Sequence, residues 1–200
     1  MSHTELPTSP IAGLRTIELG GDEEPLLQRF FEANPFYFLA IQGEPALVDE
    51  AHDEIHGQVP RDMPFTKKWV IGYLDADGEV VALANLISDL LAPGVWHLGT
   101  FIVATVRHGT GDAQLLYRNV EDWARVNGAH WMRLNIVQGH VRAERFWHRM
   151  GYAQTTERTG VVMGKRTNTL RVMVKPLADN TLEAYLARVE RDRPEAPAAR

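Results

Sequence analysis

IVATVRHGTGDA, residues 102–113, joins an apolar, β-branched run to a segment whose apolar residues recur at helical spacing. The run 95–106 is typical of a strand, and the segment 112–128 is typical of an amphipathic helix. A strand that turns directly into a helix exposes backbone N–H groups at the positive end of the helix dipole. Such a turn can bind phosphate oxygens without a lysine, and Gly109 and Gly111 allow the backbone to approach a ligand closely.

Two better-known phosphate-binding turns do not fit this stretch. A Walker loop would be closed by GK[ST], and the later segment 164–167, GKRT, lacks the preceding glycine spacing. A dinucleotide-binding turn would need a third glycine. An unrelated nucleotide-binding α/β domain is therefore disfavoured, while a turn without any ligand remains the alternative on this stretch alone.

The sequence around this turn predicts strands first and then alternating strands and helices. Such an order favours an α/β (α+β) fold with a mixed sheet and helices on its faces. Pro35 is expected to stop the first helix, and residues 75–78, DADG, are expected to form a hairpin turn. The predicted strands are 14–19, two runs within 67–87, 95–106, 130–137, 152–163 and 169–175, and the predicted helices are 22–35, 45–57, 112–128 and 142–151.

Composition limits the classes of protein that the chain can belong to. Its 200 residues and 44% hydrophobic content suit one domain, expected at 13–177, with a tail at 178–200 that is partly helical or disordered. The absence of cysteine excludes disulfides, thiolate metal sites and a catalytic thiol, and we expect no metal. A net charge of −5 disfavours nucleic acid as a partner. The sequence has no signal peptide and no run near the roughly 20 apolar residues of a membrane span, so we expect a cytoplasmic protein without membrane contact.

Two segments in the same order resemble the GNAT superfamily of N-acetyltransferases. Residues 108–113, HGTGDA, are similar to the family's Arg/Gln-x-x-Gly-x-Gly/Ala turn. Residues 140–152, HVRAERFWHRMGY, are similar to its Asn-x-x-Ala-x-x-Phe-Tyr-x-x-x-Gly-Phe pattern. The resemblance implies the GNAT fold, a mixed, mostly antiparallel, twisted central sheet of about six to seven strands with helices on both faces. It also implies acetyl-CoA, or CoA, as a co-substrate that works without a metal.

The resemblance also implies which residues bind the acyl-CoA. A backbone N–H near Val103 is expected to stabilise the developing oxyanion, and the turn is expected to bind the pyrophosphate. The implied cofactor-binding residues are Ile102, Val103, Ala104, His108, Gly109, Thr110, Gly111, Asp112, Ala113, His140, Arg142, Arg145 and Phe146.

Three positions depart from the family pattern. His108 stands where Arg or Gln is usual, and His140 stands where Asn is usual. Trp147 replaces a Tyr whose hydroxyl is thought to protonate the leaving thiolate, and an indole cannot act as that acid. We therefore expect Trp147 to be structural or to line the pantetheine channel. A thiolate of pKa about 8.5 can leave with little protonation, so an acid is dispensable.

Three residues are candidates for the base that deprotonates the amine. His97 shares odd parity with Val103 and would lie on the same face of the strand if no bulge intervenes, so we predict His97 as the catalytic base. A packed or surface histidine is the alternative. Asp89 and Glu18 are further candidates, each of which could equally be a solvated carboxylate.

The long irregular segment 34–66 is expected to cover the acceptor. Its aromatic and acidic side chains would suit an apolar amine, although the acids could also form an exposed helix face. We expect acetyl transfer by direct attack of a primary amine of a small molecule or peptide, and a homodimer is possible. The alternative is a catalytically degenerate acyl-CoA-binding sensor or partner protein. The aromatic and acidic side chains of segment 34–66 that are expected to surround the acceptor are Phe36, Tyr37, Phe38, Asp49, Glu50, Asp53 and Glu54.

Overall fold

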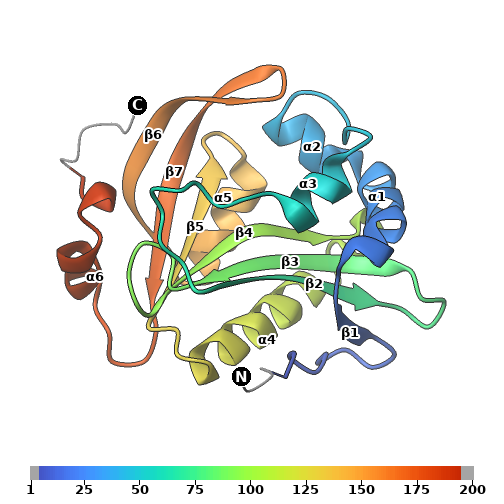
Figure 1. The fold of residues 1–200 in the computed structure, drawn as a ribbon, viewed down its shortest axis with the longest axis horizontal. Coiled ribbons are helices and arrows are strands. Elements are labelled where there is room, and N and C mark those ends of the chain that lie inside the picture. The colour runs from blue at the N-terminus through green and yellow to red at the C-terminus, as the bar shows by residue number, and fades with distance from the viewer. Residues whose placement is uncertain (1–4, 195–200) are drawn as a thin grey trace.

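The structure is a computed structural model that describes residues 5–194, in which seven strands form one open sheet (Figure 1). The strand order is β1-β2-β3-β4-β5-β7-β6, and every neighbouring pair is antiparallel except β4 and β5, which are parallel. The predicted mixed, mostly antiparallel sheet is therefore confirmed. The strands are β1 (Arg15–Glu18), β2 (Lys67–Leu74), β3 (Val80–Ser88), β4 (Val95–Val103), β5 (Trp131–Val137), β6 (Ala153–Met163) and β7 (Arg166–Pro176).

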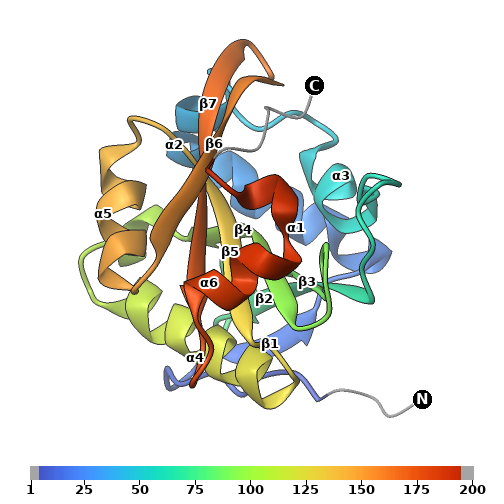
Figure 2. The same ribbon diagram turned by 90° about the vertical axis from the view of Figure 1, so that its left-hand side faces the viewer.

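Helices cover both faces of this sheet, as predicted (Figure 2). One face carries α4 and α5, and the other carries α1, α2 and α3, with α6 beside them over β5 and β7. Among residues 5–194, no helix has the length and apolar character needed to cross a lipid bilayer. The α-helices are α1 (Glu24–Ala33), α2 (Pro35–Ile41), α3 (Glu50–His56), α4 (Asp112–Val126), α5 (Val141–Arg149) and α6 (Leu182–Arg188). Short 3-10 turns are η1 (Gly21–Glu23), η2 (Thr105–Arg107) and η3 (Glu190–Asp192).

The region before β2 differs from the sequence-based prediction. Pro35 was expected to end a helix, but α1 ends at Ala33 and Pro35 is the first residue of α2. Proline suits the first position of a helix because its fixed φ is helical. An N–H at this position has no partner within the helix, so its absence in proline costs no hydrogen bond. The helix predicted at 45–57 is shorter, and α3 spans only Glu50–His56.

The two faces of the sheet have separate cores. Under α4, the rings of Trp69 and Trp96 stack with centroids 5.2 Å apart, and Trp123 meets both edge-on. Under α1 and α2, Phe31 and Phe38 pack edge-to-face at 5.0 Å. Burial of such large apolar rings supplies much of the driving force for packing the helices on the sheet.

Strand β4 contains an irregularity that places its two halves differently. Asn85 of β3 pairs with Thr100, but Leu86 pairs with Leu98, so Gly99 is an extra residue in β4. A bulge of this kind shifts the alternation of side chains by one residue. Beyond Leu98, β4 also loses its pairing with β5.

The C-terminal segment is attached to the sheet by a buried charge. Asp192 is fully buried and accepts hydrogen bonds from Arg133 Nε (2.7 Å), Arg158 Nη2 (3.0 Å) and the Tyr185 hydroxyl (2.5 Å). Burial alone would raise the pKa of Asp192, but the bonds and charge of Arg133, with Tyr185 and Arg158, outweigh burial and lower it. The end of the predicted tail, 195–200, lies outside the described residues.

We expect Asp192→Asn to lower the free energy of unfolding by about 3–5 kcal/mol, because Arg133 would remain buried without its counter-charge. The exposed pair of Asp122 and Arg125 offers a control, and Asp122→Asn should change stability by no more than about 0.5 kcal/mol. Urea denaturation measures both variants, and equal stability of the two would contradict the assignment. Because the folded pKa of Asp192 is lowered, its contribution is present above about pH 4 and is lost as the pH falls further, so wild type and Asp192→Asn should converge in acid.

Candidate active site

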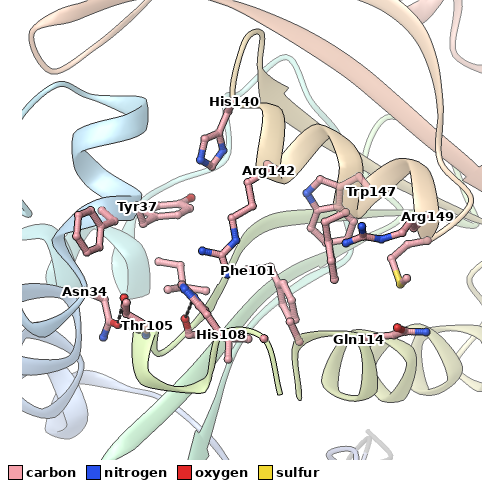
Figure 3. A pocket seen from close by; sticks show the side chains of 18 of the residues that line it. Asn34, Tyr37, Phe101, Thr105, His108, Gln114, His140, Arg142, Trp147 and Arg149 are labelled. Carbon is pink, nitrogen blue, oxygen red and sulfur yellow. Dashed lines mark hydrogen bonds between the residues drawn. The ribbon is translucent and has the colours of Figure 1, made fainter. Parts of the chain in front are cut away.

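A cavity of about 340 Å³ lies where the end of β4, the following turn, α5 and the α1–α2 junction meet (Figure 3). Most of the predicted cofactor-binding residues belong to its lining. Those that line it are Ile102, Val103, His108, Gly109, Gly111, Ala113, His140, Arg142 and Phe146.

The turn before α4 is open toward this cavity. Gly109 and Gly111 have φ of 86° and 93°, which residues with side chains rarely adopt, and apart from each glycine's own neighbours along the chain, no described residue places a heavy atom within 4 Å of where its Cβ would be. Gly111 is the N-cap of α4, so backbone N–H groups of the first helical turn are directed toward this space. The turn therefore has the positive helix end and the unobstructed backbone that a phosphate group requires.

Three other predicted residues support the turn or the core instead of lining the cavity. Thr110 donates from Oγ1 to the carbonyl of Arg107 (2.8 Å), and Asp112 accepts a hydrogen bond from Arg107 Nη1 (2.7 Å). Ala104 is buried in the core under α1 and α2. Thr110 and Asp112 thus hold the shape of the turn.

Asn34 fixes the turn from the other side, and sequence reasoning missed it. Its Oδ1 accepts hydrogen bonds from the Thr105 N–H (2.7 Å) and the Thr105 hydroxyl (3.1 Å) (Figure 3). Its Nδ2 donates to the Phe30 carbonyl (2.7 Å). The buried amide ties the α1–α2 junction to the end of β4. Its place between two short helices is visible only once the fold is known.

The backbone of Val103 is directed toward the opening between β4 and β5. The Ala104 N–H donates to Val81 of β3 (2.8 Å), and polar groups alternate sides along a strand. The Val103 N–H and carbonyl therefore point away from β3. His108 Nε2 donates to the Val103 carbonyl (2.9 Å), since a carbonyl only accepts, and burial lowers the pKa of His108 against this bond.

A second compartment of about 260 Å³ adjoins the first and lies between the diverging ends of β4 and β5. The two compartments share Tyr37, Phe101, His140, Ala143 and Trp147 in their linings. Most of the other residues around the second compartment are aliphatic. They include Ala40, Ile41, Leu98, Leu134, Ile136 and Leu170.

His140 lies at the junction of the two compartments. Burial lowers its pKa, the nearby Arg142 lowers it further, and Glu144 opposes the shift. Tyr37 of α2 also lines both compartments. Burial, with the charge of Glu54, raises the pKa of Tyr37. At neutral pH, the junction therefore contains a neutral imidazole and a neutral phenol.

Arginines of α5 differ in which side of the helix they occupy. Arg142, Phe146 and Arg149 follow the i, i+4, i+7 pattern of one helix face and all line the first compartment. The predicted Arg145 is exposed and lies outside the lining. Arg149 was not predicted, although its spacing from Arg142 would have indicated it.

Trp147 belongs to an aromatic cluster and also lines both compartments. Its ring meets those of Tyr117 (5.0 Å between centroids), Phe146 (4.8 Å) and Tyr152 (5.4 Å) edge-on. The ring is 8% exposed. This environment fits a structural role for Trp147 in the wall of the two compartments.

The predicted placement of His97 on the same face as Val103 is wrong. Trp96 and Leu98 share the α4-side core with Val103, because the extra residue Gly99 shifts the alternation between them. His97 therefore faces the opposite side, where its Nδ1 lies 3.2 Å from Arg133 Nη1. Burial, with the charge of Arg133, lowers the pKa of His97 to about 3, which is too low for the predicted titration near neutrality. His97 does line the second compartment.

The two carboxylates considered beside His97 lie elsewhere. Asp89 accepts hydrogen bonds from the Thr66 hydroxyl (2.7 Å) and the Gly94 N–H (2.7 Å) in the turn between β3 and β4. Glu18 forms an exposed ion pair with Lys67 at 3.6 Å. Both side chains have structural partners outside the two linings.

Among the acids predicted to surround the acceptor, Glu54 is the one bonded to the sheet. It accepts hydrogen bonds from Asn85 Nδ2 (2.5 Å) and Thr100 Oγ1 (2.9 Å), and burial raises its pKa against these bonds. Asp49 and Asp53 are exposed. The remaining members of that set are divided between the cavity, the core and a local turn: Phe36 and Tyr37 line the first compartment, Phe38 is buried, and Glu50 binds Gln42 and the Leu47 N–H.

Comparisons with known proteins agree on the fold. The model of the acetyltransferase (GNAT) family matches residues 34–152. An acetyltransferase from Thermus thermophilus is 17% identical with a TM-score of 0.64, over 84% of this chain and 99% of that one. Spermidine N-acetyltransferase from Vibrio cholerae, in complex with CoA and spermine, is 15% identical with a TM-score of 0.62, over 83% and 96%.

A third similar structure is the ribosomal-protein-S18-alanine N-acetyltransferase from Escherichia coli. It is 12% identical with a TM-score of 0.61, over 84% of this chain and 97% of that one. A comparison with curated protein sequences gave no match. At identities of 12–17%, these solved structures show only that the chain shares their fold.

We expect Gly111→Val to weaken CoA binding at least about tenfold, equivalent to about 1.4 kcal/mol. The valine side chain would occupy the space in front of the turn and disturb the N-terminus of α4. Gly128, at the other end of α4, is a matched control because it also has positive φ (99°) and open space at its Cβ position among the described residues. Gly128→Val should be destabilised similarly yet bind CoA like wild type. Isothermal titration calorimetry measures both affinities, and unchanged binding in Gly111→Val would show that the turn is not the phosphate site.

Proposed function

The chain belongs to the acetyltransferase (GNAT) family, and on this premise we propose that it transfers an acetyl group from acetyl-CoA to a primary amine of a small molecule or peptide. The observation that carries the proposal is the continuity of two compartments, one beside the turn of Gly109 and Gly111 and one between β4 and β5. Val103 lines the first compartment at the end of β4, and Phe101 of the same strand lines both. A cofactor could enter from one compartment and an acceptor from the other.

Acetyl-CoA binding is supported by three features of the first compartment. The backbone N–H groups of the turn suit the pyrophosphate. Arg142 and Arg149 supply positive charge for the remaining phosphate oxygens. Phe101 and Phe146, whose rings stack at 6.3 Å between centroids, offer an apolar wall for the pantetheine chain.

The proposed reaction is a direct attack of the amine on the thioester. The amine nitrogen forms a bond to the carbonyl carbon, the C–S bond breaks, and the thiolate of CoA leaves. The Val103 N–H donates to the carbonyl oxygen as negative charge develops on it. His140, which is neutral at physiological pH, accepts the proton that the amine must lose.

The second compartment favours an amine with an apolar body. Its walls are mainly aliphatic, and its volume of about 260 Å³ suits a small molecule or the end of a peptide. Structural neighbours include enzymes named for spermidine, phosphinothricin and a ribosomal protein. The family fold therefore serves acceptors of very different size, and we base the proposed acceptor on this chain's own lining.

The function is tested by measuring free thiol released from acetyl-CoA over a library of primary amines. We expect amine-dependent release of one thiol per acetylated product, with apolar amines giving higher kcat/KM than polyamines. Mass spectrometry should find the acetyl group on the amine nitrogen. CoA binding without amine-dependent release across the library would favour a degenerate acyl-CoA-binding protein.

We expect the kcat/KM for the acceptor amine to fall as the pH drops below about 6.5, because a protonated His140 cannot accept another proton. His140→Gln should be slower and should lack the part of the acid limb that His140 contributes. The control is His97→Gln, which should keep that limb because His97 stays neutral over this range. A wild-type limb in His140→Gln, or its loss in His97→Gln, would contradict the assignment of the base.

A further inference from the structure

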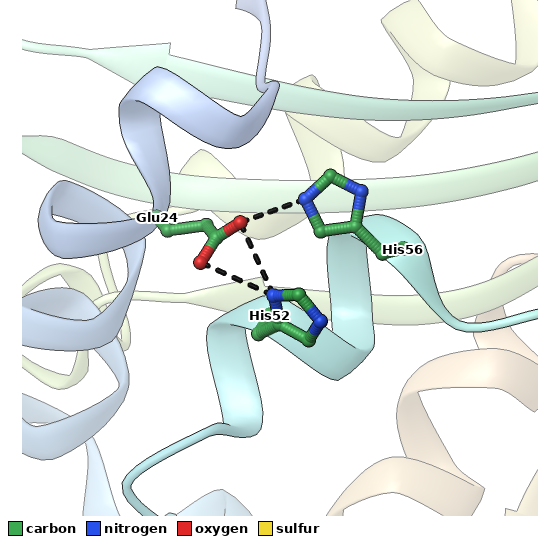
Figure 4. A group of neighbouring side chains, drawn as sticks. All are labelled: Glu24, His52 and His56. Atoms are coloured by element: carbon green, nitrogen blue, oxygen red, sulfur yellow. Dashed lines mark hydrogen bonds and ion pairs between the residues drawn. The ribbon is translucent and has the colours of Figure 1, made fainter.

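Three groups that can bind a metal meet on the surface, away from the active site (Figure 4). Glu24 is the first residue of α1, and His52 and His56 lie on α3. Glu24 Oε1 lies 2.7 Å from His56 Nε2 and 3.3 Å from His52 Nδ1. One ligand atom from each residue lies within 4.8 Å of the other two.

The fold presents these side chains together. His52 and His56 are four residues apart and share one face of α3, with ring centroids 4.7 Å apart. Glu54, between them, is bonded to the sheet, so the histidine face is directed outward. Gln28 of α1 accepts a hydrogen bond from the Ala51 N–H (3.1 Å), which keeps α1 beside α3.

Lys68 holds the other end of α3. Its Nζ donates to the carbonyls of Glu54 (2.6 Å), Ile55 (3.2 Å) and Gly57 (3.0 Å). A cation at the C-terminus of a helix interacts favourably with its dipole. The helix that carries both histidines is thus positioned by contacts that do not involve Glu24.

We propose that Glu24, His52 and His56 form a site for a divalent transition-metal ion, with zinc as the best match. Two imidazoles and one carboxylate suit zinc, whereas magnesium and calcium prefer oxygen ligands. Bonds of about 2.0–2.1 Å in a tetrahedron place ligand atoms about 3.3 Å apart. The two separations from Glu24 Oε1, 2.7 and 3.3 Å, therefore need only small adjustments, and the two histidine nitrogens, within 4.8 Å of each other, can approach by side-chain rotation.

Solvent completes the coordination. The side chains of His52, His56 and Glu24 are 59%, 46% and 31% exposed, so water can reach the fourth position. The ion would link the start of α1 to α3. This site is independent of acetyl transfer, and the ion takes no part in that reaction.

Zinc titration of chelator-treated, tag-free protein by isothermal calorimetry tests the site. We expect one ion per chain with micromolar or tighter affinity, and weak or no binding of magnesium. His52→Gln, His56→Gln and Glu24→Gln should each weaken zinc binding about tenfold or more. His148, exposed on α5, supplies the control, and His148→Gln should bind zinc like wild type.

Hydrogen exchange gives a second measurement that needs no variant. Zinc, but not magnesium, should slow exchange of the α3 backbone amides of residues 50–56. The proposal is overturned if wild type binds no zinc, if the three ligand variants bind it as wild type does, or if zinc leaves exchange in α3 unchanged. Far-UV circular dichroism should show that all variants are folded, since the substituted side chains are on the surface.

Discussion

The parting of β4 from β5 is the feature on which the candidate site depends. The two parallel strands pair only from Val95 with Trp131 to Leu98 with Leu134, whereas β4 stays paired with β3 as far as Val103. An extra residue at Gly99 marks the change, and side chains beyond it are shifted by one position. The sheet thus remains continuous on one side of β4 and opens on the other. Both compartments border this opening. Backbone polar groups of β4 that would otherwise pair with β5 are therefore directed at a cavity.

The closed end of the β4–β5 pair is secured by a buried network. His97 and Arg133 lie opposite each other in these strands, and Arg133 is held by Asp192 of the C-terminal segment. The open end is bordered by Asn34, which ties the α1–α2 junction to the turn after β4. Segments from both ends of the chain therefore support the same opening. This arrangement accounts for a pair of strands that is hydrogen-bonded at one end and separated at the other.

Much of the fold was predictable because it rests on local patterns. Alternation and turn residues indicated the strands, and the glycine turn at 108–113 with the pattern at 140–152 indicated the cofactor side. The position of His97 was not predictable, since a one-residue bulge has no unambiguous signal in sequence and reverses the face of every later side chain. Asn34 was missed for a related reason, because its partner Thr105 lies far along the chain. Residues that act through tertiary contacts need the fold before their roles become visible.

In the proposed complex, acyl-CoA lies along the turn before α4 with its thioester at the β4–β5 opening. Amide NMR of the isotope-labelled protein, titrated with acetyl-CoA and separately with a pantetheine fragment that lacks the pyrophosphate, tests this placement. We expect acetyl-CoA to shift the amides of Gly109, Gly111, Asp112 and Val103, and the fragment to shift Val103 while leaving the turn largely unchanged. Shifts confined to other elements, or a Val103 amide unaffected by both ligands, would contradict it.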